Sequence, residues 1–170
     1  MRSLTLFKDK AGFTLIEVVI VLGLVVLIAG TGLFIDFDNL RGRLFHSDKE
    51  TLIAALQHAR SQAVASICRG EDCEDFLSGR PHGVKIFNDR FVLFQGDSYD
   101  DRDPGVDAEI EANGNIDKDC AAIDCEVVFA VLSGDVANPG EIVLTDTTSS
   151  RSSTITVGVE GQIFWDDERI

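Results

Sequence analysis

The sequence predicts an α+β fold in which a long N-terminal helix, first apolar and then amphipathic, packs on a C-terminal antiparallel β-sheet domain. Two observations support this prediction. Apolar residues recur at helical spacing as far as residue 67. From Gly83 onward, short β-type runs alternate with turn residues. A helix followed by antiparallel strands is typical of a domain whose helix covers one face of the sheet.

The first half of the predicted helix, residues 13–36, has the character of a membrane segment. Glu17 is the only charged residue between Lys10 and Asp36. The apolar run exceeds the roughly 20 residues that a helix needs to cross the hydrocarbon core. Basic residues precede the run and do not recur until Arg41, so the N-terminus is expected in the cytoplasm and the rest outside it.

The second half of the helix, residues 37–68, is predicted to be amphipathic and to pack against the sheet. Glycines at 30, 32 and 42 would weaken the helix locally. Residues 1–12 form a short basic leader, and residues 69–170 the extracytoplasmic β-rich domain. The apolar stripe of the second half comprises Leu40, Leu44, Leu52, Ile53, Leu56, Ala59, Ala63 and Ile67.

Five strands are predicted in the C-terminal domain. Turn residues such as Asn88-Asp89, Asn138-Pro139-Gly140 and Gly161 separate the β-type runs. The expected strands are residues 84–87, 90–94, 126–132, 141–145 and 153–159.

The composition argues against nucleic-acid binding and against catalysis. The chain has 15 Lys and Arg against 29 Asp and Glu, for a formal net charge of -14, whereas phosphate binding needs clustered basic residues. His46, His58 and His82 are expected to be surface or interface residues, because no Ser or Cys lies in a recognisable nucleophile setting. We therefore expect no enzyme activity and no nucleic-acid partner.

The N-terminal segment decides the functional interpretation. A short basic leader ends at Gly12, Phe13 follows it, and an acid lies at Glu17 within a long apolar run. This arrangement resembles the signal of type IV prepilins and type II secretion pseudopilins. The resemblance implies cleavage between Gly12 and Phe13 by an inner-membrane prepilin peptidase, N-methylation of Phe13 by the same enzyme, and retention of the apolar helix as an anchor.

The position of Glu17 has a physical logic in such a protein. A carboxylate in an apolar helix costs about 2.5 to 3.5 kcal/mol on insertion scales, so it should have a partner or a function. Cleavage before Phe13 would create a free amine at the start of the helix. In a filament, Glu17 of one subunit could neutralise the Phe13 amine of its neighbour, so that assembly relieves the cost of both charges.

A second, looser resemblance concerns the rest of the chain. Residues 58–63 and the terminal segment 155–163 are similar to the minor pseudopilin H and FimT-like minor pilin group. The resemblance implies a low-abundance subunit near a filament tip, with other pilins or pseudopilins, an inner-membrane assembly platform and the lipid bilayer as partners. Protein secretion through a type II system and a type IV pilus both remain open.

Two alternatives to a purely structural filament subunit remain open, and the first is a DNA-capturing minor pilin that acts as a binding module. Some FimT-like minor pilins are associated with DNA capture, but this chain ends in an acidic segment, residues 166–168. A membrane-anchored extracytoplasmic domain is the other alternative. If that domain were an enzyme, mutation of Glu17 would leave its activity intact, whereas the function of a filament subunit would be lost.

The four cysteines are expected to form disulfides. They fall into two C-x4-C pairs without a nearby His, a spacing wider than that of most zinc sites, and disulfides are favoured in an extracytoplasmic domain. Three pairings are open, and free thiols or a metal are the less favoured states. The cysteines are Cys68, Cys73, Cys120 and Cys125.

Two acidic segments, residues 97–107 and 113–119, could supply oxygen ligands to calcium. Neither matches the EF-hand template, and Asp, Pro and Gly also describe an exposed loop, so a solvated loop is favoured and no cofactor is expected. The candidate calcium ligands in the first segment are Asp97, Asp101, Asp103 and Asp107.

Overall fold

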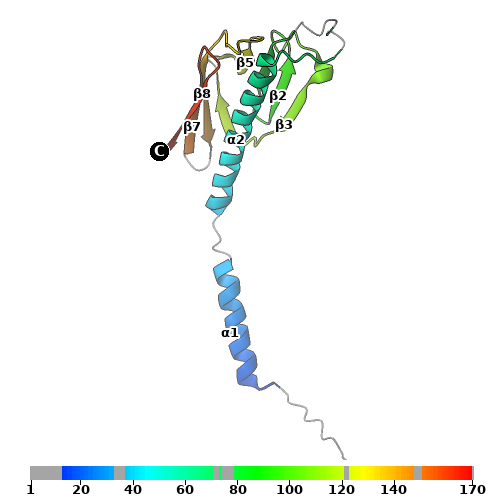
Figure 1. Cartoon of the computed structure of the whole chain (residues 1–170). Coiled ribbons are helices and arrows are strands. Elements are labelled where there is room, and N and C mark those ends of the chain that lie inside the picture. Colours follow the sequence, from blue (N-terminus) through cyan, green and yellow to red (C-terminus); the bar gives the residue numbers. More distant parts are fainter. Residues whose placement is uncertain are drawn as a thin grey trace, which may run out of the picture. The chain divides into compact units, whose positions relative to one another are not determined.

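The computed structural model describes residues 13–32, 37–70, 73, 79–120, 123–147 and 151–169. The chain divides into two compact units, Met1–Phe37 and Asp38–Ile170. The first contains helix α1 (Leu15–Gly32), and the second contains the strands and nearly all of helix α2 (Phe37–Val64). The predicted α+β class is confirmed (Figure 1).

Helix α1 covers most of the predicted apolar segment. Thr14 caps its N-terminus, because the Glu17 backbone N–H donates to Thr14 Oγ1 at 3.3 Å and the Val18 N–H donates to the Thr14 carbonyl at 3.2 Å. The predicted leader and residues 33–36 lie outside the described residues.

The strands of the described residues form two antiparallel sheets instead of the single sheet that the sequence predicted. The first has the order β3-β2-β1-β5 and the second β4-β6-β7-β8. The strands are β1 (His82–Ile86), β2 (Arg90–Gln95), β3 (Ala108–Glu111), β4 (Ile116–Asp119), β5 (Glu126–Phe129), β6 (Gly140–Asp146), β7 (Arg151–Val157) and β8 (Ile163–Arg169).

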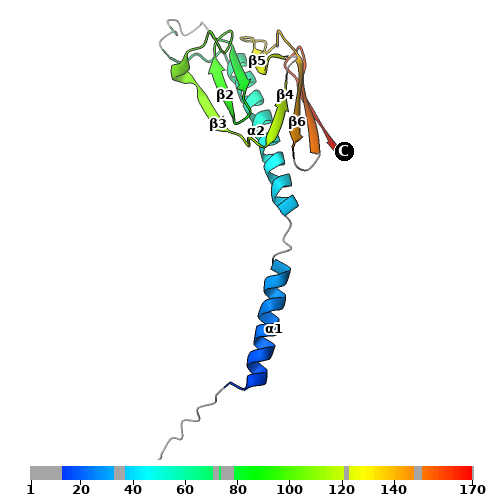
Figure 2. The same cartoon turned by 180° about the vertical axis from the view of Figure 1, so that it is seen from behind.

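Both sheets present alternate side chains to one hydrophobic core. In the first sheet, Val84 of β1 lies opposite Leu93 of β2 and Val127 of β5, and all three are buried. In the second sheet, Ile142 of β6 pairs with Ile155 of β7, and both are fully buried. Helix α2 runs along one side of both sheets (Figures 1 and 2) and closes the core.

The buried stripe of α2 agrees with the predicted stripe except near its beginning. Leu44 is exposed and Phe45 is buried in its place, because the observed face repeats in steps of three and four residues. The side chain of Leu40 lies outside the described residues, and Ile67 follows the helix end. The buried face of α2 comprises Gly42, Phe45, Asp48, Lys49, Leu52, Ile53, Ala55, Leu56, Ala59, Gln62 and Ala63.

Helix α2 ends at Val64, four residues before the predicted end. Ser66 adopts a left-handed conformation with φ 52°. Its N–H donates to the Ala63 carbonyl, and the N–H of Ile67 donates to the Gln62 carbonyl, both at 3.0 Å. This bond pattern is a Schellman motif, which satisfies the last carbonyls and stops the helix.

The predicted strand at residues 126–132 was too long. Strand β5 ends at Phe129, because the chain turns back immediately afterwards. The Ala130 N–H donates to the Asp135 carbonyl at 2.8 Å, the Gly134 N–H donates to the Ala130 carbonyl at 2.9 Å, and Leu132 has a φ of 67°. Strands β3, β4 and β8 were not predicted.

Two buried lysines tie α2 to the second sheet. Lys49 Nζ lies 2.8 Å from Asp167 Oδ1 on β8, and its side chain is 3% exposed. Lys118 Nζ, on β4, donates to the carbonyls of Asn88, Asn113 and Ile116 at 2.7, 3.1 and 3.0 Å.

Asp48 of α2 completes the surroundings of Lys118. Its Oδ2 lies 3.6 Å from Lys118 Nζ and accepts the Asn113 N–H at 2.8 Å. Burial lowers the pKa of Lys118, and the nearby Asp48 carboxylate opposes this effect. The helix and the sheet are therefore joined by charged contacts as well as by apolar packing.

Candidate functional site

The N-terminal segment begins with the residues that the sequence singled out. Phe13 precedes α1 by two residues and is 79% exposed. Glu17 lies in the first turn of α1 and is also exposed. A carboxylate in the first turn interacts favourably with the partial positive charge of the helix N-terminus. Gly12 lies outside the described residues.

The apolar side chains of α1 are exposed around its whole circumference. Their exposed fractions run from 45% at Val18 to 83% at Leu15, and Glu17 is the only charged residue of the helix. A helix that is apolar on every side gains free energy when it is buried, either against other protein or in lipid. The segment therefore has the physical character of an interaction element with one carboxylate near its start.

Within the described residues, no helix combines the length and the apolar character needed to cross a membrane. The membrane-spanning role of residues 13–36 stays a prediction.

Comparison with protein families identifies this segment. Residues 7–33 match the family model described as the prokaryotic N-terminal methylation motif. The chain carries a prepilin-type methylation motif. This methylation motif includes Gly12, Phe13 and Glu17 and ends one residue after α1. Comparisons with curated proteins and with solved structures gave no match.

The methylation motif supports a type IV pilin- or pseudopilin-like protein. It implies processing by a prepilin peptidase and assembly with other pilins, and it suggests a structural protein anchored to a membrane. The exposed apolar surface of α1 agrees with assembly, because packing against other apolar helices would remove that surface from water.

The structure pairs each cysteine with its near neighbour in the sequence. Cys68 is bonded to Cys73 and Cys120 to Cys125, with Cα–Cα distances of 5.8 and 4.8 Å. The second pair closes a tight turn in which Asp124 and Cys125 have φ values of 51° and 52°. This disulfide therefore fixes the entry into β5 in a conformation that non-glycine residues seldom adopt.

The four candidate calcium ligands do not converge on one point. Asp103 Oδ1 accepts the Gly105 N–H at 2.9 Å, and Asp107 Oδ2 accepts from Arg102 Nε at 2.7 Å. Asp97 and Asp101 are exposed. Among the described residues, no three His, Cys, Asp or Glu side chains are placed to hold a metal ion.

Strand β4 accounts for most of the second acidic segment, residues 113–119. The predicted loop is confined to its first three residues, where the Asn113 side chain accepts the Asn115 N–H at 3.0 Å. From Ile116 onward the chain is an extended strand with Ile116 and Lys118 buried.

The expectation for the histidines was wrong at His82. His46 and His58 are exposed, but His82 begins β1 and is 4% exposed. Its Nδ1 lies 2.9 Å from the Arg80 carbonyl, and burial lowers its pKa. The predicted strand began at residue 84 and so did not include His82, because Pro81 and Gly83 interrupt the alternating pattern of strand side chains.

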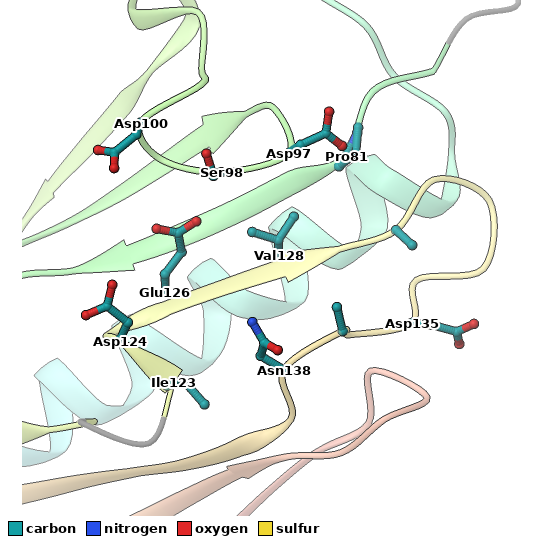
Figure 3. Close-up of a pocket in the computed structure, with 12 residues that line it drawn as sticks. Pro81, Asp97, Ser98, Asp100, Ile123, Asp124, Glu126, Val128, Asp135 and Asn138 are labelled. Atoms are coloured by element: carbon teal, nitrogen blue, oxygen red, sulfur yellow. The ribbon is translucent and has the colours of Figure 1, made fainter.

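A cleft on the β-rich domain was not predicted from the sequence. Its volume is about 450 Å³, within the roughly 300 to 1,000 Å³ of ligand sites. Figure 3 shows that residues from several segments line it, including Asp97 to Asp100 after β2, Asp124 to Val128 around β5, and Asp135 to Asn138. We call this feature the acidic cleft.

Proposed function

We propose that this protein is a minor pilin or pseudopilin that is cut after Gly12, methylated on Phe13 and assembled into a filament through α1. The observation that carries the proposal is the methylation motif on a helix whose apolar side chains are exposed all round and whose only charge is Glu17. The assembled object is either a type II secretion pseudopilus or a type IV pilus.

Before assembly, the precursor would lie in the inner membrane with its N-terminus in the cytoplasm and its β-rich domain outside. The charge distribution around residues 13–36 supports this orientation. After cleavage, the methylated amine of Phe13 keeps its positive charge. Glu17 of a neighbouring subunit then supplies the opposite charge in apolar surroundings, where an unpaired carboxylate is costly.

The proposed place of the protein is near the filament tip, as a low-abundance subunit. The similarity of residues 58–63 and 155–163 to the minor pseudopilin H and FimT-like group supports this place. DNA capture is not favoured, because the net charge is -14 and the exposed Asp166 lies on the edge strand β8.

Co-expression with a prepilin peptidase tests the proposal. Intact mass and N-terminal sequencing should show a chain that begins at N-methylated Phe13 only when the peptidase is present. The variant Gly12→Val should stay uncut. The variant Glu17→Gln, which keeps the side-chain size but removes the charge, should be cut and methylated normally yet fail to enter filaments.

An uncut wild-type chain beside a peptidase that processes a known prepilin would refute the proposal. Normal assembly of Glu17→Gln would leave the processing intact but would remove the role proposed for the charge pair.

A further inference from the structure

We propose that the acidic cleft docks a short, positively charged polypeptide segment of a partner protein. This site lies on the unit Asp38–Ile170 and does not depend on α1 or on the methylation motif. Three properties of the cleft identify the occupant. They are its apolar floor, the distribution of its charges, and the lack, within the described residues, of ion pairs for three of its carboxylates.

The cleft has an apolar floor. Val128 and Ala130 of the β5 region, Ala137 and Pro81 contribute to its lining. On β5, Val127 and Phe129 are buried in the core, so Glu126 and Val128 project to the opposite face, as Figure 3 shows. The aliphatic stem of a lysine or arginine could lie on such a floor while its charged head reaches the rim.

Carboxylates are distributed around the rim. Asp97 and Asp100 stand on one side, Asp124 at one end and Asp135 on the other side, and all four are exposed (Figure 3). They do not form a cluster suited to one metal ion, since no such cluster occurs in the part of the chain that the structure describes. Separated carboxylates match several cationic side chains of one segment better than a single ion.

Two cations near the cleft, Arg102 and Lys85, are already engaged by other groups of the protein. Arg102 is held by Asp107 at 2.7 Å and by the Tyr99 carbonyl at 2.6 Å. Lys85 donates to the Asp124 carbonyl at 2.9 Å and to Glu126 Oε2 at 3.4 Å.

Three rim carboxylates therefore form no direct ion pair with a described residue, although the charge of Asp100 acts on the nearby Arg102 and, after the hydrogen bond to Asp107, helps to raise its pKa. Within the described residues, neither Asp97, Asp100 nor Asp135 takes part in an ion pair. A second copy of the chain, with its net charge of -14, would be repelled from this rim.

A hydrogen bond, aromatic contacts and a disulfide hold the segments around the cleft in place. The Tyr99 N–H donates to Glu126 Oε1 at 2.9 Å, which ties the segment after β2 to β5. The Tyr99 ring packs against the rings of Phe87 and Phe94, with distances between ring centroids of 5.5 and 5.6 Å. At the other end, the Cys120–Cys125 disulfide fixes the turn that carries Asp124. A preformed rim lowers the entropy cost of binding.

Binding of model peptides to residues 38–170 tests the proposal, because this unit contains the whole hydrophobic core. The probes are an acetylated hexapeptide of alternating lysine and serine, and the same peptide with glutamate in place of lysine. Calorimetry at low ionic strength should detect only the lysine peptide, and added salt should weaken its binding. Amide NMR shifts should change at residues 97–100, 124–130 and 135–138.

Two matched triple variants make the test specific. Replacement of Asp97, Asp100 and Asp135 by Asn should weaken binding of the lysine peptide about tenfold, if each rim charge contributes as an exposed ion pair does. The control replaces Glu109, Glu111 and Glu141 by Gln. These residues are exposed and do not line the cleft, so the same change in net charge should weaken binding less than twofold.

Equal weakening by both variants would overturn the proposal, because only net charge would then matter. Shift changes spread over the whole surface would overturn it too. Displacement of the peptide by calcium alone, with the same shifts, would make the cleft a cation site instead. Self-association that produces these shifts would make a second copy the occupant. Because the experiment omits residues 1–37, its failure would leave the filament proposal unaffected.

Discussion

Replacement of Lys118 by Met is the most direct test of how α2 is held on the β-rich domain. The side chain of Lys118 is 2% exposed, and its ammonium group contacts three backbone carbonyls and Asp48. Methionine has a similar length and would fill the same space. The substitution therefore removes the charge and the hydrogen bonds with little change in packing.

The expected loss of stability in Lys118→Met follows from the polar groups that would remain without the ammonium group. Without the ammonium group, the carbonyls of Asn88, Asn113 and Ile116 lose a donor, and Asp48, whose side chain is 11% exposed, loses its neighbouring cation. Breaking one side of a buried ion pair costs about 3 to 5 kcal/mol. The Asn113 N–H still donates to Asp48, so we expect the lower figure, about 3 kcal/mol, for Lys118→Met.

A double-mutant cycle separates the contribution of the Lys118–Asp48 ion pair from the other effects of each substitution. Asp48→Asn keeps an acceptor for Asn113 but removes the charge, so it should cost about 2 kcal/mol. The double variant lacks both charges, and its loss should be smaller than the sum of the single losses by at least about 1.5 kcal/mol. Urea denaturation of residues 38–170 at neutral pH, with the m-value compared among variants, measures each free energy of unfolding.

Additive losses, or a Lys118→Met variant within about 1 kcal/mol of the wild type, would refute this reasoning. Either result would mean that the contact between Lys118 and Asp48 does not hold α2 on the second sheet.

Two further predictions concern the other contacts that shape the domain. The hydrogen bond from Lys49 lowers the pKa of Asp167 below its usual 3.8, so the stabilisation is present above that pH and is lost as the pH falls through and below it. Asp167→Asn should lower the free energy of unfolding by about 1 kcal/mol at neutral pH, because the carboxylate is half exposed. Below about pH 4, the stability of this variant should fall less steeply with decreasing pH than that of the wild type. An unchanged slope of stability against pH would contradict the prediction. Replacement of Cys120 and Cys125 by Ala should lower the free energy of unfolding by about 2 kcal/mol, because the unfolded chain gains loop entropy. The loss should exceed that for the Cys68–Cys73 pair, because Cys120 is buried and the turn at Asp124 has positive φ. Equal losses at the two disulfides in thermal melts would contradict this prediction.

The elements with strong local signals were predictable from the sequence. The apolar stripe of α2 and the β-branched cores of β1, β2, β6 and β7 were located to within a few residues. The methylation motif was equally local, because leader, glycine, phenylalanine and acid are adjacent in the chain. In each case the pattern and the physical requirement lie within one segment.

The missed strands carry charged residues where a strand pattern would be sought. Strand β3 reads Ala-Glu-Ile-Glu, and β4 reads Ile-Asp-Lys-Asp, residue types of low strand propensity. The inward position of Lys118 is stabilised by Asp48 of α2 and by three backbone carbonyls. Strand β8 likewise contains Asp167, whose partner Lys49 is distant in the sequence. Ion pairs between residues that are distant in the chain produce no recognisable pattern within one segment of the sequence.

The acidic cleft could not be predicted for the same reason. Its rim combines segments that follow β2, precede β5 and follow the turn after β5. The sequence showed that residues 97–107 are acidic, but it did not show which of them line the same cleft.

The positions of the charged contacts on α2 also bear on how the domain would respond to mechanical tension. Asp48 and Lys49 lie in the first half of α2, which follows α1 in the chain, and both bind the second sheet. Phe45 is buried beside them. A pull on the N-terminal end of α2 would load these contacts before those farther along the helix, because they lie nearer to that end. If α1 holds the subunit in a filament as proposed, these contacts would bear traction at the start of α2 while the strands remain folded.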